Sequence, residues 1–238
     1  MATESARRLI GSDGKVRLGI FDAPIDEVNH RDFVFRDPFG KPRGRLARHF
    51  GFHQLQFLGG LSERLVFGCA IVDTRYVSTA FVYGYDPVTR KRAERSVTRP
   101  LGLGVRCTDT PEVGTATFAG GGARFAMHAD AAPRRRRLVV DAGPIAIDAT
   151  FSEEAPPMEP MRICTRAGAT GWVYARKTAG LGMSGTLRWD ETSFDLGAID
   201  IYGHHDWSAG FMRPETFWNW GCLAGRTADG RIAGLNVS

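Results

Sequence analysis

Short runs of alternating apolar and polar residues, separated by turn residues, constrain the fold of this chain more than any other feature. Phe52–Leu58 and Tyr76–Tyr85 alternate, and Arg64–Val72 between them is a continuous apolar, β-rich run. Side chains on a strand point alternately to its two faces, so this period predicts strands with one buried face. The short turns between the runs favour antiparallel pairing.

Further strand candidates recur at a spacing of about 8–12 residues, which is typical of an all-β sandwich or barrel. We expect them at Thr115–Phe118, Arg124–His128, Arg137–Asp141, Ile145–Phe151, Ile163–Thr165, Gly171–Lys177 and Gly182–Trp189. No long amphipathic helix is expected. The predicted fold class is therefore all-β, an antiparallel meander that forms two barrel or sandwich units.

The domain organisation follows from changes in composition along the chain. Residues 1–44 are polar and rich in turns, and we expect an extended N-terminal wrap there. The proline-rich segment 153–161 cannot contribute a regular ladder of hydrogen bonds, so it predicts a boundary between a first β unit, 45–152, and a second, 162–238. All five tryptophans follow this boundary.

The last residues, 230–238, read as a turn and a strand that stop abruptly. A barrel ending there would leave an unpaired edge. We therefore expect the second unit to be incomplete and the chain to be a fragment of a longer reading frame.

Charge and cysteine usage limit the classes of partner. The net charge of +5 is a mild excess, and part of it comes from the run Arg134–Arg137, which we interpret as a solvated hairpin turn rather than a patch for an anionic partner. We expect no nucleic-acid partner, because basic residues interleaved with aromatics are missing. The four cysteines are scattered singly, which argues against disulfides and a structural zinc site. A cytoplasmic location follows as the default.

No apolar run has the length of a signal peptide or a membrane span. We expect no integral membrane segment, while peripheral contact with a membrane stays compatible with the sequence. The oligomeric state cannot be inferred.

The segment from Tyr202 to Trp220 carries the densest group of aromatic and titratable side chains. If it forms adjacent strands, Tyr202, His204 and Asp206 share one face and can lie opposite a tryptophan pair. The candidate catalytic residues are His205 and Asp206. The candidate ligand-binding residues are Tyr202, His204, Trp207, Arg213, Trp218 and Trp220.

Several functions compete for these residues. A His/Asp pair can act as general acid and base, and aromatic walls can stabilise a developing carbocation. A metal site built on His204 and Asp206 lacks a third ligand nearby, and a triad using Ser208 lacks a nucleophile elbow, so we expect no metal and no cofactor. The structural alternative is that the tryptophans and the histidines belong to the core.

The same segment resembles the bacterial family defined by domain of unknown function 2804. The resemblance is carried by a motif near the end of the chain and by upstream segments in the expected order. These are Asp200, His205–Gly210, Arg213, Thr216, Trp218–Gly221 and Gly234–Asn236, preceded by 52–58, 73–86 and 176–187.

More distantly, the spacing is similar to that of the carotenoid 1,2-hydratase, tocopherol cyclase and AttH-like group. In that group His205 and Asp206 match a His-Asp pair, and Trp218 and Trp220 match an aromatic pair, whereas Ser208–Gly210 differ from the cyclases. The resemblance implies two lipocalin-like, calycin-type barrel units and an apolar ligand.

Two functional hypotheses follow. The first is a lipocalin-like protein that binds an apolar small molecule, lipid or isoprenoid-like, in a β-barrel cavity. The second is an enzyme for acid-initiated hydration, cyclisation or isomerisation of an unsaturated lipid, with His205 or Asp206 as the proton donor. A catalytic Asp206 should be desolvated beside the cavity and have a raised pKa.

Overall fold

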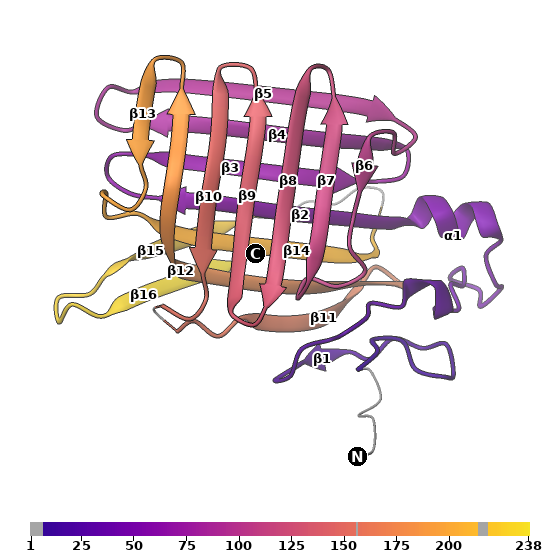
Figure 1. The fold of residues 1–238 in the computed structure, drawn as a ribbon. Helices are drawn as coiled ribbons and strands as arrows, with labels where there is room; N and C mark the ends of the chain where they lie inside the picture. Colours follow the sequence, from indigo (N-terminus) through magenta and orange to yellow (C-terminus); the bar gives the residue numbers. More distant parts are fainter. Residues whose placement is uncertain (1–6, 156, 214–218) are drawn as a thin grey trace.

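The computed structural model describes residues 7–155, 157–213 and 219–238. Within these residues the chain forms a 14-stranded antiparallel sheet and a separate two-stranded hairpin (Figure 1). The elements are β1 (Gly19–Ile20), η1 (His30–Asp32), α1 (Arg45–Gly51), β2 (Phe52–Leu61), β3 (Val66–Asp73), β4 (Val77–Asp86), β5 (Lys91–Pro100), β6 (Val105–Arg106), β7 (Gly114–Gly120), β8 (Ala123–Ala131), β9 (Arg134–Ala142), β10 (Ile145–Ser152), β11 (Met161–Ala167), β12 (Gly171–Trp189), β13 (Thr192–Asp195), β14 (Tyr202–Phe211), β15 (Gly221–Arg226) and β16 (Ile232–Val237).

The sheet is curled so that its two ends face each other. The strand order is β5-β4-β3-β2-β14-β12-β10-β9-β8-β7-β6. Figure 1 shows the strands from β12 through β10, β9 and β8 to β7 crossing in front of the layer formed by β5, β4, β3, β2 and β14. The predicted all-β, antiparallel and barrel-like fold class is confirmed, with the sheet forming a curled half-barrel.

The long strand β12 connects the two layers. Its first half pairs with β11 and β14, and its second half pairs with β10 and β13. Between the halves, the register with β14 shifts at Ala179/Leu181, and Gly180 between them has φ +82°. Glycine adopts this left-handed conformation without a steric cost, so the chain can bulge here and leave one layer for the other.

The main hydrophobic core fills the space between the two layers. It includes the fully buried rings of Phe67, Phe118, Phe125 and Phe151. Each such side chain contributes roughly 1.5–3 kcal/mol of burial free energy. A second core forms where the N-terminal segment, through Leu9, Ile25 and others, packs against β12 and β14.

In the described part of the N-terminal segment, only β1, η1 and α1 precede β2, and the extended wrap stays a prediction. The strands of the two predicted units join one sheet, because β14 pairs with β2 and β12 pairs with β10. The segment between Ser152 and Met161 contains no named strand in its described residues. The division into units at 45–152 and 162–238 stays a prediction.

The arginine run Arg134–Arg137 does not form the solvated turn that the sequence predicts. Arg134 is the first residue of β9, so the run lies in a strand, and the turn precedes it. Arg136 points inward and is buried, while Arg135 and Arg137 point outward and pair with Asp130 and Asp148. Successive side chains of a strand point to opposite faces, and a run of four identical residues does not show this pattern in the sequence.

Candidate functional site

Residues 202–211 of the predicted site segment form β14, a strand between β2 and β12 that is nearly all buried. We call the face of these three strands that carries His205 and Trp207 the inner face, because it meets the cores. The opposite, outer face carries His204 and Asp206. Neighbouring residues on a strand point in opposite directions, so the structure does not bring the side chains of His205 and Asp206 together.

A cavity of about 690 Å³ lies over the outer face of β2, β12 and β14. Its size is within the usual range for small-molecule pockets. Apolar and aromatic side chains predominate in its lining, with a few charged groups among them. The lining residues are Leu55, Phe57, Phe81, Arg166, Ala167, Gly168, Val173, Lys177, Asp206, Ser208, Met212, Arg213, Trp220 and Ser238.

A buried ion pair forms one part of the polar lining of this cavity. The Lys177 ammonium donates a hydrogen bond of 2.8 Å to Oδ1 of Asp206. These residues face each other because Lys177 of β12 is in register with Asp206 of β14. Burial raises the pKa of Asp206 above its ordinary value, and the charge of Lys177 together with hydrogen bonds from neighbouring side chains opposes that shift only in part.

Asn236 of β16 connects the hairpin to this ion pair. Its amide nitrogen donates to Oδ1 of Asp206 at 3.1 Å and to the backbone oxygen of Thr178 at 3.2 Å. Its amide oxygen accepts a hydrogen bond of 2.9 Å from the indole nitrogen of Trp220. Gly234 lets the hairpin lie this close, since a Cβ there would be 2.4 Å from the backbone of Ala179.

His204 lies beside the cavity, enclosed by aromatic rings. Its imidazole stacks on Phe57 at 5.4 Å and tilts against Trp220 at 5.5 Å. A Cβ at Gly59 would be 2.6 Å from the imidazole, so a glycine makes room for it. Burial lowers the pKa of His204 to about 4, and neither ring nitrogen has a hydrogen-bond partner among the described residues. The imidazole is therefore neutral at physiological pH.

His205 belongs instead to a buried network of charges on the inner face. Its Nδ1 is 3.4 Å from Nη1 of Arg176. Arg176 donates to both carboxylate oxygens of Glu153, which also accepts a hydrogen bond from Arg136. Burial, followed by the charges of Arg136 and Arg176, lowers the pKa of His205 well below its ordinary value.

The carboxylate of Glu153 in this network is firmly ionised. Burial alone would raise the pKa of Glu153, but Arg136 and Arg176 outweigh it and lower that pKa to about 2. Glu112 accepts hydrogen bonds from Arg176 at 3.2 Å and Arg162 at 2.8 Å. Buried ion pairs that satisfy each other's hydrogen bonds hold segments of the chain together. The outer cavity is lined by none of the five residues Glu112, Arg136, Glu153, Arg162 and Arg176.

The remaining predicted ligand-binding residues have different surroundings. Trp207 is buried on the inner face against Tyr174, and the Tyr202 hydroxyl donates to Asp200 at 2.6 Å. Arg213 and Trp220 line the outer cavity. Trp218 lies outside the described residues.

Sequence reasoning missed several cavity residues, above all Lys177, Phe57 and Asn236. Asn236 is part of the Gly234–Asn236 motif, so that motif was the available signal. Lys177 gave a weaker signal, a charged residue within an apolar strand. Its pairing with Asp206 joins positions 29 residues apart, and a single sequence does not reveal this register.

A metal site and a triad using Ser208 are the other chemistries considered for these residues. Within the described ranges, no group of three or more His, Cys, Asp or Glu side chains could hold a metal ion. Ser208 shares the cavity face with Asp206, whereas His205 points to the inner face.

No helix in the described part of the chain is long and apolar enough to cross a membrane.

Solved structures with a similar fold include a Nitrosomonas europaea protein provisionally named AttH. It aligns with a TM-score of 0.50 and 14% identity over 77% of this chain and 68% of that chain. CghA with Sch210972 aligns with a TM-score of 0.50 and 12% identity, over 86% of this chain and 55% of CghA. This chain thus spans little more than half of CghA, and both likenesses concern the fold alone.

No curated protein sequence matches the chain significantly. The family model described as "Domain of unknown function (DUF2804)" matches residues 1–238, its whole length. The chain therefore belongs to the DUF2804 family.

Proposed function

We propose that this protein binds an apolar small molecule, lipid or isoprenoid-like, in the cavity over the outer face of β2, β12 and β14. The observation that carries the proposal is the cavity of about 690 Å³, whose walls are mostly apolar and which contains the Lys177–Asp206 ion pair. Apolar walls provide affinity, and a few fixed polar groups orient a ligand.

The position of this cavity differs from the interior site typical of a closed barrel. The space between the layers is filled by the main core, so the ligand would lie on the other side of the sheet. Leu55 and Val173 would contact its apolar part, and Lys177 would contact a polar group at one end. The structure of CghA with Sch210972 supports the general idea that a protein of similar fold binds a compound.

A matched pair of substitutions tests the cavity. Val173→Phe adds a ring inside the cavity, whereas Val88→Phe adds the same ring at an exposed turn position. In a titration with an apolar fluorescent probe, we expect Val173→Phe to abolish binding and Val88→Phe to leave it unchanged. Unchanged binding in both variants would rule out this cavity as the site.

A second candidate function is acid-initiated hydration, cyclisation or isomerisation of an unsaturated lipid. It is favoured by one observation, the raised pKa of Asp206 beside aromatic walls. A carboxyl with a raised pKa keeps its proton to a higher pH than an ordinary aspartate does, so a larger fraction of it can serve as a proton donor near neutral pH. Trp220 and Phe57 would face the developing positive charge.

Asp206→Asn separates the two functions. If the protein is an enzyme, the variant retains the apolar probe but loses turnover of candidate isoprenoids, followed by mass spectrometry of products. If the protein only binds, wild type and variant both retain the probe and neither forms a product. Loss of folding in the variant, seen by circular dichroism, would favour a purely structural role.

A further inference from the structure

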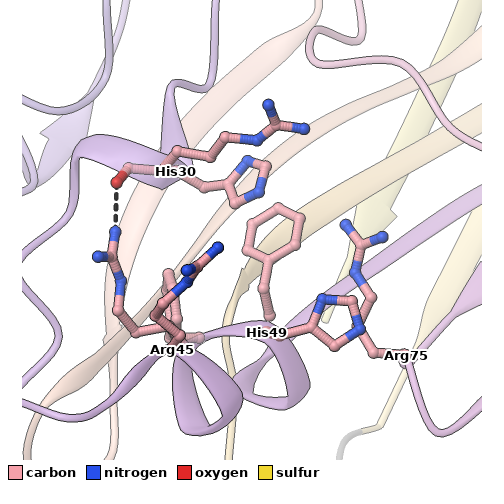
Figure 2. A pocket seen from close by; sticks show the side chains of 8 residues that line it. His30, Arg45, His49 and Arg75 are labelled. Atoms are coloured by element: carbon pink, nitrogen blue, oxygen red, sulfur yellow. Dashed lines mark hydrogen bonds between the residues drawn. The ribbon is translucent and has the colours of Figure 1, made fainter.

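A second cavity, of about 330 Å³, lies where β2 begins and β14 ends, and it gathers basic side chains (Figure 2). Four arginines and two histidines line it together with two phenylalanines, and no aspartate or glutamate is among its described lining residues. The lining residues are His30, Arg31, Arg45, Arg48, His49, Phe52, Arg75 and Phe211.

The basic groups come from three separate parts of the chain. Arg45 and His49 project from α1, His30 belongs to η1, and Arg75 lies in the turn between β3 and β4 (Figure 2). Segments that are far apart in sequence thus bring four guanidinium groups, which are always charged, to one concave place. Such a concentration raises the positive potential in the cavity and attracts anions.

Aromatic contacts hold two of these groups in place. The His30 ring stacks on Phe52 with centroids 3.8 Å apart, and the guanidinium of Arg75 lies 5.5 Å from the same ring. The side chain of Arg48 donates to the backbone oxygen of Arg31. Donors that are already oriented lose less entropy when a ligand binds.

The nearby carboxylates compensate only part of this charge. Asp73 pairs with Arg75 at 3.0 Å, and its side chain is almost fully buried outside the cavity lining. Asp109 acts on His30 through its charge. Burial, followed by the charge of Arg75, lowers the pKa of His30 to about 4, so this imidazole is neutral and the arginines supply the positive charge of the cavity.

We propose that this cavity binds a phosphate or diphosphate group of a small molecule. Guanidinium groups suit this ligand because their planar donors match phosphate oxygens in pairs. The volume of about 330 Å³ has room for a phosphorylated compound rather than a single water-sized ion. The site is separate from the outer cavity and does not depend on the function proposed for it.

Inorganic pyrophosphate is the probe, titrated calorimetrically into the whole protein at low and high salt. We expect one binding site whose affinity falls as salt rises. Arg45→Gln and Arg31→Gln should each weaken binding about tenfold or more, because each removes charged hydrogen bonds. Arg43→Gln is the matched control, since Arg43 is exposed, is close in sequence and does not line the cavity.

Both variant side chains are exposed, so circular dichroism should show that the variants fold. Equal weakening in all three variants would mean a diffuse basic surface and would overturn the proposal. Vesicles of phosphatidylcholine, with and without a phosphorylated phosphatidylinositol, distinguish the source of the phosphate. Binding only to the phosphoinositide vesicles, lost in Arg45→Gln, would support the same site with a lipid headgroup. Binding to neither vesicles nor pyrophosphate would overturn it.

Discussion

The two faces of β12 and β14 carry charged residues at neighbouring positions, yet they use them differently. On the inner face, Arg176 and Glu153 are fully buried and satisfy each other. On the outer face, Lys177 and Asp206 pair beside a cavity, and close by lies the neutral imidazole of His204, which has no hydrogen-bond partner among the described residues. The inner charges are typical of structural pairs, whereas the outer groups keep chemical capacity that a ligand could use.

The two carboxylates also differ in the direction of their pKa shifts. Arginines lower the pKa of Glu153 to about 2, whereas burial raises that of Asp206. The folded state therefore stabilises the charge on Glu153 and disfavours the charge on Asp206. The two faces of β12 thus meet carboxylates in opposite electrostatic settings, Glu153 through Arg176 and Asp206 through Lys177.

The largest expected effect comes from removing the inner carboxylate. Glu153→Gln leaves Arg136 and Arg176 buried without their main counter-charge, which should lower the free energy of unfolding by about 3–5 kcal/mol. Denaturant titration measures this loss. The exposed neighbour provides a control, since Glu154→Gln should change stability by less than about 0.5 kcal/mol. Similar losses in the two variants would contradict a special role for the inner network.

The lowered pKa of the buried His204 predicts that the protein loses stability in acid. Its pKa is about 4 in the folded protein and 6.5 without burial, so between these values the unfolded state binds a proton that the folded state does not. Stability should therefore fall as the pH drops from 6.5 towards 4, with His204 contributing roughly 3 kcal/mol. His204→Phe should reduce this fall by that amount, measured by unfolding at several pH values. An unaltered pH dependence would show that the imidazole is hydrated.

The close packing around the His204 imidazole can be tested at Gly59 in the neighbouring strand β2. Gly59→Ala places a Cβ 2.6 Å from the imidazole and 2.7 Å from the backbone oxygen of Phe67, so it should cost about 1–3 kcal/mol. Gly225→Ala, also in a strand, meets nothing within 4 Å and should cost less than about 0.5 kcal/mol. Thermal unfolding compares the two. If Gly59→Ala is as mild as its control, the ring around His204 is loosely packed.

The smallest expected effect on stability is that of Asp206→Asn, within about 1 kcal/mol. The substitution removes a charge whose burial is unfavourable and retains an acceptor for Lys177 and Asn236. The same exchange of carboxylate for amide at Glu153 should cost several times more, and denaturant titration of both variants checks the ratio. Equal costs would remove the distinction between the faces.

Much of the fold could be predicted from the sequence. Alternation located most long strands, because a half-buried strand repeats every two residues. It failed for β5, where Lys, Arg and Glu predominate. This strand lies at the edge of the sheet, where charged residues are favoured and the hydrophobic pattern is weak. The strand order was also not predictable, since it depends on long-range pairing such as that of β14 with β2.

The segment that the sequence singles out contains β14, but the sequence did not separate the two faces of that strand. The parity of Tyr202, His204 and Asp206 is as expected, and Trp220 does face His204. The opposite orientation of His205 also follows from parity, although the family motif groups it with Asp206. The partners of Lys177 and Glu153 can be predicted only from the register between strands, and the bulge near Gly180 shifts that register.

The position of β14 has a consequence for how the chain folds during synthesis. The edge of β2 at residues 52–61 is completed only when residues 202–211 have left the ribosome. Until then the meander β2–β5 has an open edge, which can pair wrongly with other chains. The pairing of such distant segments also slows folding, because a long loop must close first. Assistance by a chaperone that covers exposed strands would therefore matter most for this protein before β14 is synthesised.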